Sequence, residues 1–367
     1  MKQQSSATTE TNNKVREVID FSGKVICVGI DVHQKDYQVA KVYNGINLGN
    51  HRMSAGAAGL IKHLRSYYPG AQFKCVYESC AWGFNLQRAL TAAGMECVVA
   101  HAADVSTTDK ERKRKTDAVD ALKLARSLEA GEITPIHVPD ETLQKERSLL
   151  RYRANVTGDI TRSKNRLKSL LKFSGIDIPE QYAKNNWSNN FLKWVAEQAA
   201  KDELLKDTLL LLLEEIKLLR QLLLKVEKKL RGLSQGKYKE QAALAMSVPG
   251  IGPHTALLFL LEAGDVRRFK GFDALNDFVG LCPDTNSTGE KEQATGITRR
   301  GHRRLRSAMV EAAWQAIRID PALLESYQQL TKRMTGTKAI IRIARKLLRR
   351  LRCVLLRGTP YQKGVIA

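Results

Sequence analysis

The chain has 367 residues, enough for two or three domains, and it carries 60 Lys and Arg against 38 Asp and Glu. A formal charge of +22 is typical of proteins that bind a polyanion, so nucleic acid is the expected partner. No apolar run of about 18 residues and no signal peptide occurs, which argues against a membrane protein and predicts a cytoplasmic one, associated with the nucleoid when bound to DNA.

The first part of the chain predicts a polar tail at residues 1–22 and then an α/β domain. An apolar, β-branched run from Val25 predicts a buried strand that ends on the carboxylate of Asp31. A later strand that begins at Phe73 ends on a second carboxylate, Glu78. Further strands are predicted at 37–42, 46–53 and 96–100, and helices at 55–68 and 82–93.

A helix that Thr116 can cap carries Asp117 and Asp120, which share one face because they are three residues apart. Singly, each acid has an ordinary explanation, such as compensation of a helix dipole. Converging with Asp31 and Glu78, they would repel by about 4 kcal/mol per close pair at an effective dielectric near 20. Such a cluster is stable only around cations. Carboxylate oxygens select Mg²⁺ or Mn²⁺, and a pair of such ions about 4 Å apart is a common device for phosphoryl transfer.

The middle of the chain predicts two long helices. Apolar residues step by four and three from Leu205 to Leu233, the heptad seam of a coiled coil. A looser seam runs from Leu149 to Leu170. The two seams can pair as a hairpin joined through residues 174–190, or one can pair with a second subunit. Periodicity alone does not separate these arrangements; we favour association into a homo-dimer or higher homo-oligomer.

Gly250 and Gly252 form a Gly-x-Gly turn between two predicted helices. Such a turn is typical of a helix-hairpin-helix element, whose backbone N–H groups bind phosphate. A simple helix start with Pro253 in its first turn explains the same residues. The stretch 280–291 has the composition of a loop.

Ser287 and Thr288 in this stretch are either turn residues or exposed nucleophiles among arginines. From Ala294 to the end the chain holds seventeen Lys and Arg against three Asp and Glu, a net charge of +14. A final helix at 338–356 surrounds its apolar face with basic residues, which are either solvated or bind a nucleic-acid backbone. The residues expected to bind nucleic acid are Gly250, Gly252, Arg299, Arg300, Arg303, Arg304 and Arg306.

Five motifs follow one another in a characteristic order: Gly-Ile-Asp-Val at 29–32, Tyr-Glu-Ser at 77–79, the helix start at 115–121, the glycine turn at 248–252 and the arginine-rich stretch at 297–306. From about residue 25 to 357 the chain therefore resembles the bacterial insertion-sequence transposases that carry an Asp-Glu-Asp-Asp tetrad, the bridge-RNA-guided recombinases.

This resemblance implies a RuvC-like, RNase H-type α/β domain at 23–132, a helical coiled-coil segment at 133–238 and a mainly α transposase domain at 239–367. It also implies DNA, both element ends and target, and a guide RNA as partners. The tetrad maps onto Asp31, Glu78, Asp117 and Asp120, as catalytic residues and metal ligands.

The family's nucleophilic serine stands directly before the glycine of the loop at 280–291. The matching position here is Thr288, and Ser287 precedes it. Of the two hydroxyls, we favour Ser287 as the nucleophile.

The predicted function is DNA recombination, in which a metal-assisted serine attacks a phosphodiester at sites chosen with a guide RNA. The alternative is an RNase H-like or junction-resolving nuclease that uses water as its nucleophile. A third interpretation is an architectural DNA-binding protein with a degenerate nuclease fold. Joined strands distinguish the first from the second, and metal-dependent cutting distinguishes both from the third.

Overall fold

The computed structural model describes residues 20–102, 116–183, 187–288, 291–298 and 300–363. The chain forms two compact units, residues 1–138 and 139–367. The first contains a mixed α/β sheet, and the second is mostly helical. The predicted middle segment and C-terminal region thus fall within one unit.

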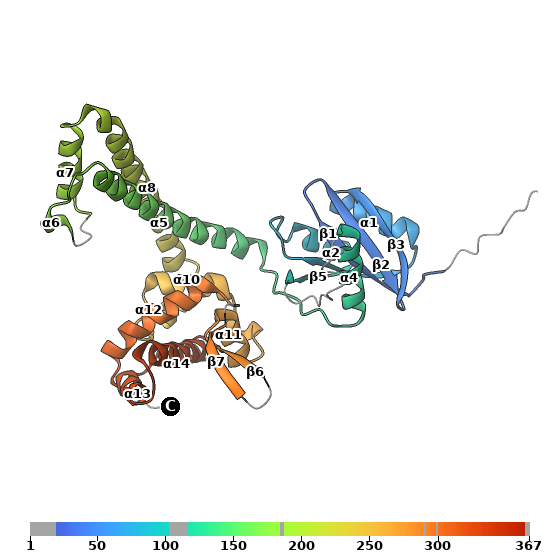
Figure 1. Cartoon of the computed structure of the whole chain (residues 1–367). Helices are drawn as coiled ribbons and strands as arrows, with labels where there is room; N and C mark the ends of the chain where they lie inside the picture. Colours follow the sequence, from blue (N-terminus) through green and yellow to red (C-terminus); the bar gives the residue numbers. More distant parts are fainter. Residues whose placement is uncertain (1–19, 103–115, 184–186, 289–290, 299, 364–367) are drawn as a thin grey trace, which may run out of the picture. The chain divides into compact units, whose positions relative to one another are not determined.

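Five strands of the first unit form one sheet in the order β3-β2-β1-β4-β5 (Figure 1). β1 (Val25–Val32), β2 (Asp36–Tyr43) and β3 (Ile46–Ser54) form an antiparallel meander. β4 (Gln72–Glu78) pairs in parallel with β1, and β5 (Glu96–Ala100) pairs in parallel with β4. All five predicted strands are confirmed. The two strands that carry the acids are neighbours: Asp31 is the next-to-last residue of β1, and Glu78 is the last residue of β4.

Helices cover both faces of this sheet. α1 (Ala57–Tyr67) and α2 (Asn85–Ala92) bury leucines with Ile30 on one face. α4 (Asp117–Glu129) covers the other face, where its alanines pack against Val42 of β2. The polar first turn of α4 therefore lies at the end of the sheet where strands β1 and β4 finish.

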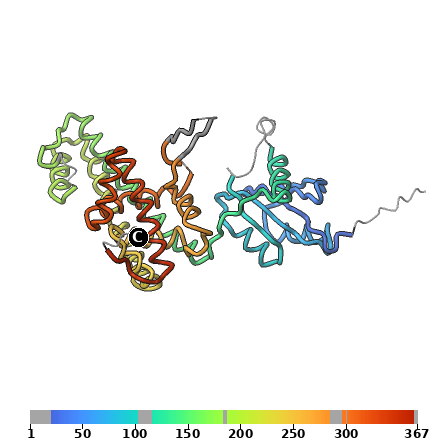
Figure 2. Tube along the Cα trace, turned by 90° about the horizontal axis from the view of Figure 1, so that it is seen from below, coloured from blue at the N-terminus to red at the C-terminus, as the bar shows by residue number. Residues whose placement is uncertain are grey.

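The second unit begins with two long helices that pack side by side, α5 (Glu141–Phe173) and α8 (Glu203–Gln235). α6 (Glu180–Ala183) and α7 (Asn189–Ala199) connect them. Both views place α6 and α7 at the end of the pair that is remote from the C-terminal helices (Figures 1 and 2).

The heptad seam of α8 is covered within the chain. Leu209 and Ile216 are buried against apolar residues of α5 and α7. Val226 and Leu230 belong to the core of the C-terminal helices, together with Leu150 of α5. The hairpin arrangement is therefore the one that forms, and our preference for dimerisation through this seam is corrected, because its apolar stripe already has a partner in the same chain.

The C-terminal helices share the core that contains Val226 and Leu230. They are α9 (Lys239–Ser247), α10 (Pro253–Ala263), the 3-10 turn η2 (Val266–Arg268), α11 (Phe272–Val279), α12 (Arg303–Ile319), α13 (Pro321–Thr331) and α14 (Gly336–Arg357).

Among the described residues, no helix has the length and apolarity needed to cross a membrane.

Between α11 and α12, β6 (Pro283–Thr288) and β7 (Lys291–Ile297) pair as an antiparallel ribbon. The prediction of a loop here was wrong. The segment is rich in Asp, Asn, Ser, Thr and Gly, and it lacks the apolar alternation by which a strand is recognised in a sequence.

Candidate functional site

The parallel register of β1 and β4 places two predicted acids at neighbouring strand ends. Ile30 pairs with Tyr77, so the next residues, Asp31 and Glu78, lie on adjacent strands close to where both strands end. Of these two acids, only Asp31 belongs to the cluster of close ligand atoms described below. Gly29 and Val76, which lie two positions before Asp31 and Glu78, both contact α4. Because side chains alternate along a strand, both acids belong to the face that α4 covers.

Gly29 sets how closely α4 approaches β1. A Cβ atom at this position would lie 2.0 Å from the Ala121 carbonyl oxygen and 2.5 Å from the Ala125 backbone nitrogen. No side chain fits in that space, so glycine is required for this contact. The close approach carries the acidic first turn of α4 to the end of β1.

Two further contacts fix the start of α4. The Thr116 hydroxyl caps the helix by accepting a hydrogen bond from the Val119 backbone N–H at 3.4 Å, as predicted. Asn50 of β3 donates its side-chain amide to the Ala118 carbonyl oxygen at 2.6 Å. The first turn is thus tied to the sheet.

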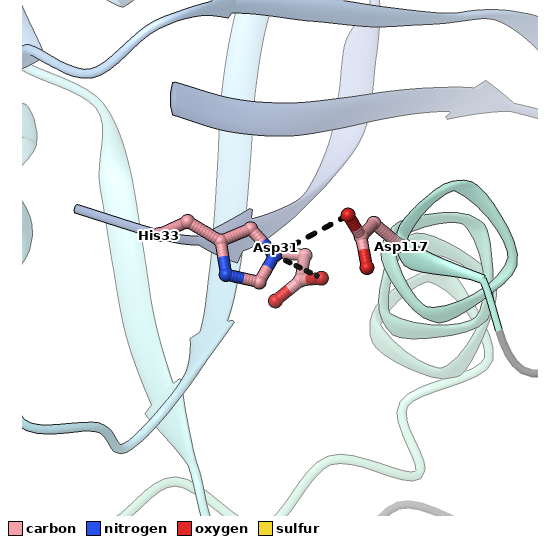
Figure 3. Close-up of side chains that lie close together, drawn as sticks. All are labelled: Asp31, His33 and Asp117. Carbon is pink, nitrogen blue, oxygen red and sulfur yellow. Dashed lines mark hydrogen bonds and ion pairs between the residues drawn. The ribbon is translucent and has the colours of Figure 1, made fainter. Parts of the chain in front are cut away.

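Three side chains converge at this edge of the sheet (Figure 3). His33 Nε2 lies 3.2 Å from Asp31 Oδ2 and 3.5 Å from Asp117 Oδ2. One ligand atom from each of the three residues lies within 4.8 Å of the other two. His33 was absent from the predicted site. The available signal was its spacing of two from Asp31, which places both on one side of an extended chain.

The carboxylates influence one another electrostatically. Burial raises the pKa of Asp31 above its ordinary value; the nearby His33 opposes this shift, and the charges of Asp117 and Asp120 add to it. Asp120 therefore lies close enough to disfavour a negative charge on Asp31. A set of carboxylates with one imidazole suits a divalent cation, which would relieve this repulsion.

Gly29→Ala is expected to destabilise the protein by about 3 kcal/mol, because the added methyl group must displace the backbone of α4. The first turn of α4 should shift with it. Thermal unfolding measures the loss. Gly59→Ala is the matched control, since a Cβ there meets only the end of the Met53 side chain at 3.6 Å. Equal stabilities for the two variants would contradict this account of Gly29.

In the second unit, the backbones of Ser287 and Thr288 lie in β6, opposite Glu292 and Lys291 of β7. Their side chains, and the whole of Arg299, lie outside the described part of the chain. Their predicted roles in catalysis and in nucleic-acid binding stay predictions.

Hydrogen bonds to backbone carbonyl oxygens hold the two ends of the ribbon together and to the start of α12. Thr298 N–H donates to the Cys282 carbonyl oxygen at 3.1 Å. Arg306 donates to the carbonyl oxygens of Thr298 at 2.6 Å and Gly280 at 3.3 Å. Arg306 thus has a structural role. The exposed arginines of the predicted set are Arg300, Arg303 and Arg304.

A buried carboxylate fixes the start of α12. Glu262 of α10 is 2% exposed and accepts two hydrogen bonds from Arg151, at 3.0 and 2.8 Å. His302 Nε2 lies 3.3 Å from the same carboxylate, and its Nδ1 accepts the Leu305 N–H at 3.2 Å, which caps α12. Burial alone would raise the pKa of Glu262, but the hydrogen bonds from His302 and Arg151 lower it to about 2. Glu262 was not predicted from the sequence, in which its only signal was an acid directly after the apolar run 257–261.

The glycine turn packs on α12. Gly250 has a φ of 81°, and a Cβ there would lie 2.1 Å from the Ala312 carbonyl oxygen, so glycine is needed for this contact. Gly252 is the N-cap of α10, with Pro253 in the first turn. The helix start that was one of our two interpretations is confirmed, and phosphate binding by Gly250 and Gly252 stays a prediction.

α14 and the base of the ribbon line a cavity of about 810 Å³. Two of its arginines, Arg345 and Arg349, lie over the ring of Phe272 at 5.7 and 4.6 Å. Its basic lining suits a phosphate-bearing polymer. The cavity is lined by Pro283, Gly296 and Ile297 of the ribbon and by Arg342, Arg345, Lys346 and Arg349 of α14, among others.

Comparison with known proteins gives matches over both units. Residues 28–175 match the family model DEDD_Tnp_IS110, described as a transposase, and residues 242–328 match the model described as Transposase IS116/IS110/IS902 family. The chain is 30% identical over 310 residues to the putative transposase y4qE of Sinorhizobium fredii (strain NBRC 101917 / NGR234), and this match covers 82% of this chain and 73% of that protein. It is 24% identical over 296 residues to the transposase for insertion sequence element IS1533 of Leptospira borgpetersenii, covering 79% and 85%. It is 25% identical over 294 residues to the transposase for insertion sequence element IS1328 of Yersinia enterocolitica, covering 78% and 84%.

Proposed function

The chain belongs to the IS110/IS116/IS902 family of insertion-sequence transposases, and from this premise we propose that it cuts and rejoins DNA by attack of a protein hydroxyl on a phosphodiester. The attack forms a protein–DNA phosphodiester, breaks one P–O bond of the strand and releases a deoxyribose hydroxyl; a DNA hydroxyl then attacks this phosphodiester, joins the strands and releases the side chain. The observation that carries the proposal is the convergence of Asp31 and Asp117 at the edge where β1 and β4 end. Carboxylates in this arrangement serve phosphoryl transfer.

We assign the first unit an RNase H-type, RuvC-like fold with Asp31, Glu78, Asp117 and Asp120 as the holders of Mg²⁺ or Mn²⁺. A cation bound there supplies Lewis-acid polarisation of the phosphodiester. The protein's own part is positional: β1 and β4 fix two of the acids, and the close contact at Gly29 fixes the other two through α4. Asp31, whose pKa is raised by burial, would have to be ionised to hold such a cation.

Ser287 is the proposed nucleophile, and Thr288 occupies the position that the family resemblance favours. A hydroxyl attacks phosphorus poorly at neutral pH unless its proton is removed. The carboxylates that can support such activation belong to the first unit, and the hydroxyls belong to the second. The reaction therefore requires both units, from one subunit or from two, on the same DNA.

The proposed partners are the DNA of the element ends and target, together with a guide RNA. The net charge of +14 after Ala294 and the basic cavity beside the ribbon support nucleic-acid binding by the second unit. The test is to purify the protein from its native cells, sequence the RNA that remains bound, and add that RNA to the protein and element DNA. Joined strands that depend on the RNA are the expected result. Cut strands without joining would favour the nuclease alternative.

A second apolar stripe of α8, distinct from the buried seam, supports self-association. Leu204, Leu211 and Leu218 are exposed and seven residues apart, so they line one side of the helix. The exposed charges along α8 also change sign. The first half of the helix exposes Glu203, Asp207 and Glu214, and the second half exposes Lys225, Lys228 and Lys229.

Replacing Leu211 and Leu218 with Lys is expected to convert a dimer to a monomer. Burial of each leucine contributes about 1.5–3 kcal/mol, so the dimer dissociation constant should rise more than about 1000-fold. Analytical ultracentrifugation measures the mass. The matched control replaces Leu210 and Leu224, which are exposed on another side of α8 (42% and 67%, against 65% and 56% for the tested pair). An unchanged mass in the tested variant would rule out this stripe as the interface.

A further inference from the structure

We propose that His33 Nε2 is itself a metal ligand, so that the centre binds its cation through nitrogen as well as oxygen. This inference rests on the proposed metal centre and adds to it a residue outside the acidic tetrad. The observation behind it is the position of the His33 imidazole, whose Nε2 lies near carboxylate oxygens of both Asp31 and Asp117 (Figure 3).

The spacing of the three donor atoms fits coordination of one ion. Neighbouring ligands of an octahedral cation with bonds of about 2.1 Å lie about 3 Å apart. His33 Nε2 lies 3.2 and 3.5 Å from the two carboxylate oxygens, close to that separation. Small side-chain movements would therefore place all three atoms around an ion.

The backbone at His33 is fixed by the turn that joins β1 to β2. His33 N–H donates to the Asp36 carbonyl oxygen at 3.0 Å. The Asp36 side chain in turn accepts a hydrogen bond at 2.8 Å from Arg52 of β3. These contacts fix the main chain at His33 through three neighbouring strands, and the imidazole extends from this fixed position.

A nitrogen ligand changes the preference of the centre among cations. Both Mn²⁺ and Mg²⁺ accept carboxylate and water oxygens, but Mn²⁺, a transition metal, binds an imidazole nitrogen better than Mg²⁺ does. A centre with His33 should therefore bind Mn²⁺ more tightly, relative to Mg²⁺, than the same centre with its carboxylates alone. Removing the imidazole should lower Mn²⁺ affinity at least about tenfold and Mg²⁺ affinity much less.

The test uses the full chain with Mn²⁺ as the probe. Electron spin echo envelope modulation of bound Mn²⁺ detects a directly coordinated nitrogen, so native protein should show ¹⁴N modulation that disappears in His33→Ala. Calorimetric titration should show the fall in the ratio of Mn²⁺ to Mg²⁺ affinity. His51→Ala, which removes an exposed histidine of β3 outside the three-residue cluster, is the control and should retain both properties.

The outcomes separate this inference from the proposal on which it rests. Native protein that binds no Mn²⁺ would overturn the metal centre itself. Bound Mn²⁺ without ¹⁴N modulation, or modulation that persists in His33→Ala, would overturn ligation by His33 and leave the carboxylate centre standing.

Discussion

Asp31→Asn is expected to lower the rate of DNA strand cleavage at least about 1000-fold, equivalent to about 4 kcal/mol of transition-state stabilisation. The amide keeps the shape of the side chain but loses the negative charge with which it would hold a cation. The rate is measured on labelled element DNA in saturating Mg²⁺ or Mn²⁺. Glu96→Gln is the control, because Glu96 is an exposed acid at the start of β5, paired with Lys74 at 3.5 Å.

The same substitution should have the opposite effect on the stability of the metal-free protein. The pKa of Asp31 is raised in the folded state by burial, and the acids beside it add to that shift. A raised pKa means that the ionised carboxylate, which predominates at neutral pH, disfavours folding, and this penalty disappears as the pH falls and Asp31 takes up a proton. Asn removes the charge, so the unfolding temperature without metal should rise.

Added metal should then distinguish the two proteins further. A cation at about 100 times its dissociation constant stabilises a folded protein by about 2.7 kcal/mol, and Asp31→Asn should lose most of that gain. Thermal unfolding with and without Mn²⁺ measures both effects. A variant that cleaves DNA at the native rate would show that this cluster is not the catalytic centre.

Replacing both Ser287 and Thr288 with Ala is expected to abolish the covalent protein–DNA complex and to lower strand exchange at least about 1000-fold, because no hydroxyl would remain at either proposed position. Trapped complexes separated under denaturing conditions report the covalent bond. The single variants identify the nucleophile: loss in Ser287→Ala favours our assignment, and loss in Thr288→Ala favours the register of the family.

Thr285→Ala is the control for this experiment, since it removes a hydroxyl from the same strand, β6. Strand exchange that survives in the double variant would show that water or a DNA hydroxyl attacks the phosphodiester. The nuclease alternative would then replace the recombinase proposal.

The sequence by itself determined the elements that depend on local pattern. Apolar runs, an alternating run at 37–42 and a weaker run at 46–53 marked the five strands of the first unit. The acids near the ends of two strands were visible because a carboxylate at the end of a buried run breaks the pattern. Thr116 marked the start of α4 because an N-cap acts only on the next few residues. The spacing of Asp117 and Asp120 then followed from helical geometry.

Only the tertiary structure decided which surfaces meet. The seam of α8 showed that an apolar face must be covered, but a heptad pattern is the same whether the cover is α5 or a second subunit. His33 and Glu262 gained their partners from other elements, at 3.5 Å from Asp117 and at 2.8 Å from Arg151. Periodicity records which side of an element is apolar. The partners of its polar groups are set by long-range packing, which one segment of sequence does not encode.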